Sequence, residues 1–432
     1  MTIEQKPFPI KTETACQLKW SHSTVFLTQR SSSSCHRVHS NRIGDDFDFH
    51  NTPAKIADRE KMLKGEWPGR GCEHCKDIED AGGQSDRMLH LNFPGLGAPP
   101  EVADGDLTAT NVTPRWLEIY FSNLCNLSCL YCGDHFSSSW GSENKKFGHI
   151  NEAMSGEPFT SKDAVDYTKN YKDLNSKMFD WLDKNVHHLY NLMILGGEPF
   201  TQPQSDQLLD FLETRYNPNL TLTFFSNLSI DHERMKQRFN RMQKLKDNGH
   251  LAEIHIIGSI DCWGPEIEYV RSGLDLELFE KNMDYLVNET DVRLGVNAAW
   301  MSLSTFTMPD LIRKINKWST HKRPVFFSLM QAAGENYIHP GIFGPKVLDW
   351  GYREAVELFE TQGNNVKEGY KNYLEGILKK IENSVPDIDA QQQLHRYLTV
   401  LDERRNTDYR TLFPTIYDEI RESMQLNSDV HD

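Results

Sequence analysis

The chain has 432 residues and a formal net charge of -15 at pH 7. This length suits one large α/β domain with an appended unit, or two to three ordinary domains. The charge argues against non-specific nucleic-acid binding, because a phosphate backbone attracts a basic surface. No apolar run reaches about 18 residues and the start lacks the order of a signal peptide, so we expect no membrane segment and a cytoplasmic location.

The first part of the chain is predicted to be a small, loop-dominated module over residues 1–110. It is serine-rich around SSSSC and rich in glycine and proline in GEWPGRG and FPGLGAPP, which are typical of turns and loops. Its apolar periodicity is too weak to predict a hydrophobic core. We therefore expect a metal site to hold this module together.

From Trp116 the sequence alternates between β-rich runs and amphipathic helical patterns. This alternation indicates right-handed βαβ units and a parallel sheet. We predict an α/β fold with a partial (β/α)6 TIM-like barrel over 114–335 and a helical C-terminal extension over 336–432. The strands are expected at 116–124, 190–196, 220–227, 252–261, 292–301 and 324–330, and the helices between them at 176–189, 205–216, 232–248, 276–288 and 307–318.

Three cysteines follow the first predicted strand in the stretch SNLCNLSCLYCGDH: Cys125, Cys129 and Cys132. In a reducing compartment, clustered cysteines are more often metal ligands or catalytic groups than disulfides. Zinc fits this spacing if His135 completes the site. An iron–sulfur cluster with one open iron fits equally well. The polar connection that follows, 133–171, is unusually long, and such loops are often functional.

A second motif, Gly196-Gly197-Glu198-Pro199, follows the second predicted strand. Glycines let a backbone approach a ligand closely, and a carboxylate can receive an ammonium group. Alone, such a segment is most often a turn with an exposed glutamate. One βα unit after the cysteines, it makes residues 116–330 resemble the radical S-adenosylmethionine (SAM) superfamily. That family carries a Cys-x3-Cys-x2-Cys loop with an aromatic residue, here Tyr131, before the last cysteine.

The resemblance implies both a cofactor set and an activity. Cys125, Cys129 and Cys132 would hold a [4Fe–4S] cluster whose open iron binds SAM, and the GGEP segment would hold the methionyl amino group. Reductive cleavage of SAM would release a 5′-deoxyadenosyl radical. A low-potential electron donor such as flavodoxin or ferredoxin is implied as a partner.

Polar residues at later strand ends match the family as well. Ser226 and Asn227 close the third strand, where the family often places a polar contact to SAM. Ser259-Ile260-Asp261 and the following Tyr-Val-Arg-Ser-Gly resemble the "SID…YxRxG" arrangement of the peptide- and protein-modifying branch. There the serine and the arginine, here Ser259 and Arg271, contact SAM. The alternatives are a helix N-cap for the serine and a solvated helix residue for the arginine. Asn297 is a further candidate.

Four other cysteines precede the predicted barrel and can form a complete four-thiolate site: Cys16, Cys35, Cys72 and Cys75. Together with the stretch DREKMLKGEWP, they resemble the SPASM and twitch auxiliary-cluster modules, which usually follow the barrel. The resemblance implies an auxiliary [4Fe–4S] cluster, and a structural zinc ion is the alternative. The eighth cysteine, Cys262, is expected to be an ordinary buried thiol, with substrate contact as the alternative.

Three functions are compatible with these motifs. The first is an enzyme that abstracts a hydrogen atom from a peptide or protein side chain and leads to its oxidative modification. The second is a radical SAM enzyme that acts on a small metabolite, with 133–171 as a lid. The third is a zinc-stabilised binding protein without catalysis.

Overall fold

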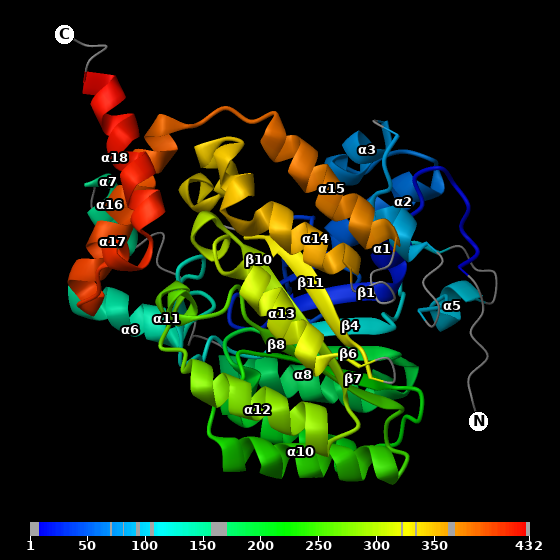
Figure 1. Cartoon of the computed structure of the whole chain (residues 1–432). Helices are drawn as coiled ribbons and strands as arrows, with labels where there is room; N and C mark the ends of the chain where they lie inside the picture. The colour runs from blue at the N-terminus through cyan, green and yellow to red at the C-terminus, as the bar shows by residue number, and fades with distance from the viewer. Residues whose placement is uncertain are drawn as a thin grey trace. The chain divides into compact units, whose positions relative to one another are not determined.

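The computed structural model describes residues 8–69, 71–80, 82–91, 96–103, 108–156, 171–320, 323–332, 335–361 and 368–428. It is a mixed α/β fold with a large, mostly parallel sheet (Figure 1). The chain divides into two compact units. The first comprises Met1–Leu124, Val165–Phe225 and Lys236–His255, and the second comprises Cys125–Ala164, Ser226–Met235 and Ile256–Asp432.

The described residues of the first unit form six strands in the order β7-β6-β4-β1-β2-β3. Their bounds are β1 His22–Phe26, β2 Ser31–Ser33, β3 Asn41–Arg42, β4 Trp116–Tyr120, β6 Asn191–Leu195 and β7 Thr221–Ser226, the last of which ends one residue beyond the unit. Strands β7, β6, β4 and β1 are parallel, with Ile194 opposite both Ile119 and Phe224. Strands β2 and β3 are antiparallel additions at one edge.

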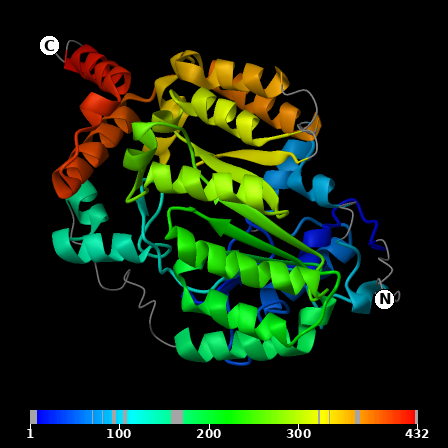
Figure 2. The ribbon, with the colours of Figure 1, turned by 60° about the horizontal axis from the view of Figure 1, so that its bottom comes forward.

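Aromatic side chains join the helices of this unit to the ends of its strands. Phe179 of α8 stacks on Phe121, the residue after β4, with ring centres 5.8 Å apart. Phe239 of α10 lies 5.7 Å from Phe200, which stacks on Phe224 of β7 at 5.1 Å. Figure 2 shows the helices that follow the strands lying along them. The bounds are α1 Gln17–Ser21, α2 Pro53–Leu63, α3 Glu73–Asp80, α4 Asp86–His90, α5 Pro100–Ala103, α8 Tyr171–Asn185, α9 Pro203–Glu213 and α10 His232–Asp247, which begins in the second unit.

The N-terminal segment differs from the predicted loop-dominated module. Strand β1 pairs with β4 inside the main sheet, and a buried apolar cluster includes Leu18, Trp20 and Met62. The apolar pattern of the sequence did not predict this strand, because the buried side chains on β1 include polar ones that form hydrogen bonds. His22 lies 3.2 Å from the Glu118 carboxylate, and Thr24 donates to the same carboxylate at 2.7 Å. Strand burial here does not need apolar alternation.

Among its described residues, the second unit holds strands of the large sheet in the order β11-β10-β8, of which β10 and β11 are parallel and β8 begins in the first unit, and a separate antiparallel pair, β5 and β9. The strand bounds are β5 Ser128–Cys129, β8 Glu253–Ser259, β9 Arg271–Ser272, β10 Arg293–Trp300 and β11 Val325–Gln331. The helices are α6 Ser138–Phe147, α7 Ile150–Ser155, α11 Pro265–Val270, α12 Leu276–Glu289, α13 Met308–Trp318, α14 Arg353–Thr361, α15 Glu368–Glu382, α16 Ile388–Arg405, α17 Tyr409–Leu412 and α18 Pro414–Ser428.

The strands and helices predicted from residue 116 onward are confirmed, each within a few residues of its expected bounds. The C-terminal extension is helical in its described residues, apart from connecting segments. Within the long connection 133–171, helices α6 and α7 occupy much of the first half, and residues 157–170 lie outside the described residues.

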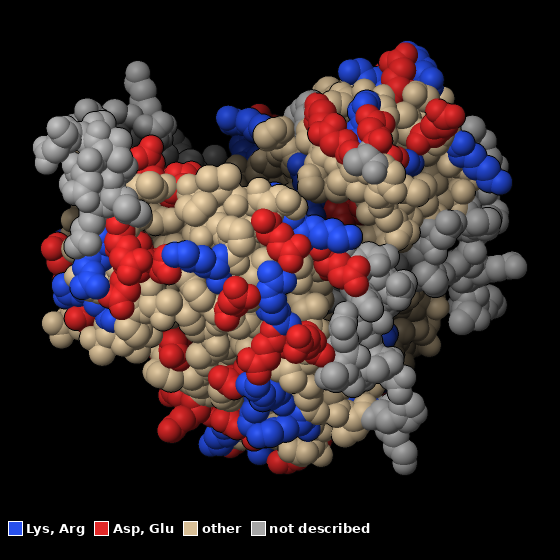
Figure 3. Space-filling view, turned by 45° about the horizontal axis from the view of Figure 1, so that its top comes forward, with Lys and Arg blue, Asp and Glu red and all other residues tan. Residues whose placement is uncertain are grey.

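Over the described ranges, the chain contains no helix that is both long and apolar enough to cross a membrane. On the face that Figure 3 shows, acidic and basic side chains are interspersed.

Candidate functional site

The cysteine loop follows β4 and belongs to the second unit. Cys129 lies on β5 and pairs with Arg271 on β9. Several hydrogen bonds fix the loop backbone: Ser139 Oγ donates to the Cys125 carbonyl at 2.8 Å, and Trp140 Nε1 donates to the Cys129 carbonyl at 2.9 Å. The three thiols therefore lie on a segment whose backbone carbonyls are held by hydrogen bonds from neighbouring side chains.

Ser226 and Asn227 lie in the same unit, at the end of β7. Asn227 Nδ2 donates to Asn126 Oδ1 at 2.8 Å, and Asn126 Nδ2 donates to the Ser229 carbonyl at 2.8 Å. Ser226 Oγ accepts from the Leu228 amide at 3.0 Å. These side chains thus hold the cysteine loop against the turn after β7, and their contact with SAM stays a prediction.

Asp261 is the centre of a buried ionic network beside the cysteine loop. Its carboxylate accepts from Arg271 Nε and Nη2, both at 2.9 Å, from Tyr131 Oη at 3.1 Å, and from the Ala299 amide at 2.8 Å. The Arg271 guanidinium also lies 5.5 Å from the centre of the Tyr131 ring. One carboxylate therefore joins the cysteine loop, strand β9 and strand β10.

The environment sets the charge states in this network. Burial opposes the charge of Arg271, yet the Asp261 carboxylate outweighs it and raises the pKa of Arg271 well above its usual range. Burial raises the pKa of Tyr131 as well, so its hydroxyl stays protonated and donates. Arg271 lies on a strand with 6% of its surface exposed, so the alternative of a solvated helix residue is wrong.

Replacing Asp261 with alanine should cost about 3–5 kcal/mol of unfolding free energy, because it leaves the buried Arg271 charge unpaired. Asp310→Ala is the matched control, since it removes a carboxylate from Arg313 in an exposed pair with side chains 52% and 46% accessible. That loss should be below about 1 kcal/mol. Urea unfolding of both variants measures the difference, and equal losses would contradict a structural role for Asp261.

Ser259 and Asn297 occupy strands of the second unit. Ser259 is the last residue of β8 and is half-buried. It is not a helix N-cap, because the next helix, α11, has Gly264 in that position. Asn297 lies inside β10, where its carbonyl accepts from the Ile260 amide at 3.1 Å. Both remain predicted SAM contacts.

The GGEP segment belongs to the first unit and forms a tight, buried turn. Gly196 and Gly197 have φ of +80° and +55°, and a Cβ on Gly197 would lie 2.2 Å from the Leu124 carbonyl oxygen. Only glycine fits there. Glu198 is 0% exposed, and its carboxylate accepts from the Phe200 amide at 3.0 Å. The alternative of a turn with an exposed glutamate is therefore wrong, and amino-group binding stays a prediction.

The four N-terminal cysteines, Cys16, Cys35, Cys72 and Cys75, line one small cavity in the first unit together with Lys19. Lys19 Nζ lies 2.6 Å from the Asp58 carboxylate. Burial raises the pKa of Cys16 to about 12 and that of Cys72 to about 11, while the Lys19 ammonium acts in the opposite direction on both.

The donor sets fit the implied groups, although no three Cys, His, Asp or Glu side chains of the described residues stand in the arrangement of a bound metal ion. All eight cysteines are free thiols. Four thiols around one cavity suit a four-thiolate site. Three thiols on one loop, with Cys132 also lining a cavity, suit a cluster with an open iron. Zinc remains the alternative at each site.

The sequence did not identify Asp261 as a functional residue. The signal was present, since Asp261 is the second residue after strand β8, at the end where functional groups gather. Its partners Tyr131 and Arg271 lie 130 and 10 residues away along the chain. Cys262, the next residue, is 0% exposed, as expected for a buried thiol.

No protein-family model and no curated protein matches this chain. Among solved structures, it is similar to Streptococcus suis SuiB bound to precursor peptide SuiA (15% identity, 68% of this chain and 47% of that chain covered, TM-score 0.33). It is also similar to SuiB bound to S-adenosylmethionine (15%, 72% and 64%, TM-score 0.38). A third similar structure is native anSMEcpe with bound AdoMet and a Kp18Cys peptide (18%, 62% and 67%, TM-score 0.35). The chain spans less than two thirds of the two SuiB chains.

Proposed function

We propose that this chain is a radical SAM enzyme that takes a hydrogen atom from a peptide or protein side chain and leads to its oxidative modification. The observation that carries the proposal is the cysteine loop, whose residues Asn126, Cys129 and Tyr131 are hydrogen-bonded to Asn227, Trp140 and Asp261. A loop fixed by such contacts suits a three-thiolate site, because the ligands must stay in place with one metal position open.

Cys125, Cys129 and Cys132 would hold a [4Fe–4S] cluster, which when bound supplies the single electron that cleaves SAM to methionine and a 5′-deoxyadenosyl radical. The remaining residues bind and orient. Asp261 keeps Tyr131 fixed beside the last cysteine. It also engages Nε and Nη2 of Arg271, so Nη1 is the nitrogen that we assign to SAM. Ser226, Asn227, Ser259 and Asn297 are the further proposed contacts.

The GGEP segment is proposed to bind the methionyl amino group. Gly196 and Gly197 let the turn pack closely against Tyr120 and Leu124, and the Glu198 carboxylate that follows them is buried. A buried carboxylate interacts more strongly with an ammonium group than an exposed one does, because the local dielectric constant is lower. The proposed electron donor is a flavodoxin or a ferredoxin.

The test is anaerobic reconstitution of the full chain with iron and sulfide, followed by reduction in the presence of SAM. We expect 5′-deoxyadenosine as a product, with deuterium incorporated when the true substrate is deuterated on the attacked carbon. Deuterium that enters 5′-deoxyadenosine from a labelled small metabolite, and not from a peptide, would support the alternative that the substrate is a metabolite. A chain that retains zinc, binds no iron and leaves SAM intact would contradict the proposal.

A further inference from the structure

A cavity of ≈ 290 Å³ lies beside the cysteine loop, within the second unit. Its walls come from loop residues 130–135, from α6 and α7, from residues 335–338, and from Tyr397 of α16. Helix α16 also holds two of these walls together, because Arg396 donates to the Ala153 carbonyl at 2.9 Å and Arg404 donates to the Gly148 carbonyl at 3.0 Å. A cavity of this volume accommodates one side chain or a small molecule.

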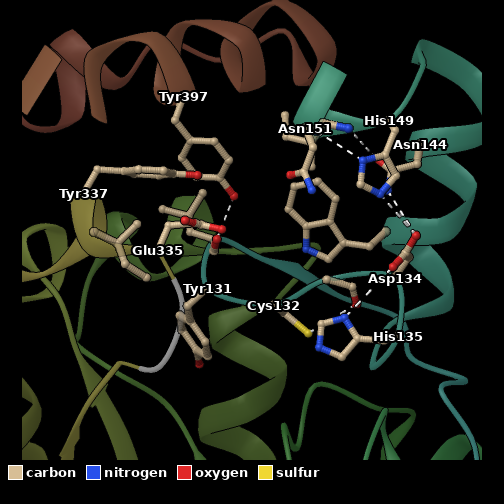
Figure 4. A pocket seen from close by; sticks show the side chains of 15 residues that line it. Tyr131, Cys132, Asp134, His135, Asn144, His149, Asn151, Glu335, Tyr337 and Tyr397 are labelled. Carbon is tan, nitrogen blue, oxygen red and sulfur yellow. Dashed lines mark hydrogen bonds and ion pairs between the residues drawn. The ribbon is translucent and has the colours of Figure 1, made fainter. Parts of the chain in front are cut away.

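Aromatic side chains form much of the wall. Figure 4 shows Tyr131, Tyr337 and Tyr397 around the space that Cys132 also faces. The hydroxyl of Tyr131 donates to Asp261 at 3.1 Å, and that of Tyr397 donates to the Leu130 carbonyl at 2.7 Å. Since these hydroxyls hold the wall together, the two residues present mainly ring surface to the cavity. The Tyr131 ring already has the Arg271 guanidinium 5.5 Å from its centre, so Tyr397 and Tyr337 supply the ring surfaces that carry the argument. Aromatic ring faces attract cations.

The charges on the wall are acidic. The carboxylates of Asp134 and Glu335 line the cavity, whereas its described lining contains no lysine or arginine. The nearby Arg271 is neutralised by Asp261. The nearby Arg404 and Arg405 share the Glu143 carboxylate, at 3.8 Å and 3.1 Å.

Two histidines lie beside the Asp134 carboxylate. Nδ1 of His135 is 4.0 Å from it, and Nε2 of His149 is 3.6 Å from it. His149 accepts from the Asn151 amide at Nδ1 (3.2 Å), so the proton of its ring lies on Nε2, on the side of Asp134.

We propose that this cavity binds the cationic group of the substrate, a primary ammonium or guanidinium as on a lysine or arginine side chain. Asp134 and Glu335 would attract the charge, and the tyrosine rings would cover it. The same wall repels carboxylates and phosphates. That the ligand is the substrate rests on the proposed function, whereas the preference for a cation rests on the wall alone.

The test is calorimetric binding to the full chain without SAM or reductant. The probes are Nα-acetyl-lysine methylamide, its uncharged norleucine isostere, and the corresponding glutamate compound. The lysine probe should bind about tenfold more tightly than the norleucine probe, and the glutamate probe should not bind measurably. Equal affinities for the lysine and norleucine probes, or preference for glutamate, would overturn the proposal.

Variants locate the binding. Glu335→Gln and Asp134→Asn should each weaken the lysine probe about five- to tenfold while leaving the norleucine probe unchanged, and the exposed control Asp310→Asn should change neither. If both cavity variants bind the lysine probe as tightly as the wild-type chain does, the proposal is overturned. Displacement of the probe by SAM would also overturn it. SAM cleavage is assayed separately: a chain that cleaves SAM without preferring lysine refutes only the cation site, and one that prefers lysine without cleaving SAM refutes only the proposed function.

Discussion

Replacing Cys125, Cys129 and Cys132 together with alanine is expected to abolish 5′-deoxyadenosine formation while leaving the chain folded. The thiols are the only groups that the substitution removes. The loop keeps the contacts that do not depend on sulfur, including the bond from Trp140 to the Cys129 carbonyl and the bond from Asn227 to Asn126. The loss should therefore come from the missing ligands and not from a displaced loop.

Product chromatography and iron analysis measure this outcome together. Reconstituted iron should fall by about four atoms per chain, because each [4Fe–4S] cluster carries four. Cys262→Ala is the matched control. Its thiol is 0% exposed, and burial raises its pKa, so it stays protonated and inert. That variant should keep both iron and activity. Undiminished product from the triple variant would contradict the assignment of these cysteines.

The strands from β4 onward were predictable because their side chains follow the rule that buried parallel strands are apolar. Leu192, Ile194, Leu222 and Phe224 are all 0% exposed. Strand β1 was not predictable by that rule. Its His22, Ser23 and Thr24 are buried through bonds to Glu118 and His50, and such partners become known only when the chain is folded.

The candidate site was also predictable only in part. The three cysteines could be placed on one loop from the sequence, because they lie close together along the chain. Spacing gave no information on what Arg271 contacts, since its partner Asp261 lies ten residues earlier, before helix α11, and Tyr131 lies on another loop. The burial of Glu198 was also missed, because it depends on how the turn packs and not on the four residues of the motif.

Replacing Cys72 and Cys75 with alanine is expected to remove about half of the reconstituted iron and to leave the first unit folded. The N-terminal segment does not depend on a metal alone, because Trp20 and Met62 belong to a buried apolar cluster and β1 pairs with β4. This corrects the sequence-based expectation that a metal site holds the N-terminal segment in its folded structure. Circular dichroism and iron analysis check the two halves of the prediction.

The functional effect should fall on the last step of the reaction. Removal of a hydrogen atom leaves a substrate radical, and an oxidative product requires one more electron to leave. The four cysteines that line the cavity with Lys19 are proposed to hold the auxiliary [4Fe–4S] cluster that accepts it. The potential of that site matters, since each ~60 mV changes a one-electron equilibrium about tenfold.

Without this site, the Cys72→Ala/Cys75→Ala variant should still form 5′-deoxyadenosine and still transfer deuterium from a labelled substrate, yet fail to complete the product. Mass spectrometry of substrate and nucleoside from one reaction distinguishes the steps. Cys262→Ala should complete the product, because its thiol does not line the N-terminal cavity. Wild-type chain with about four iron atoms and one zinc ion would contradict the second cluster, because the four thiols would then hold zinc, which has no redox chemistry to accept the electron.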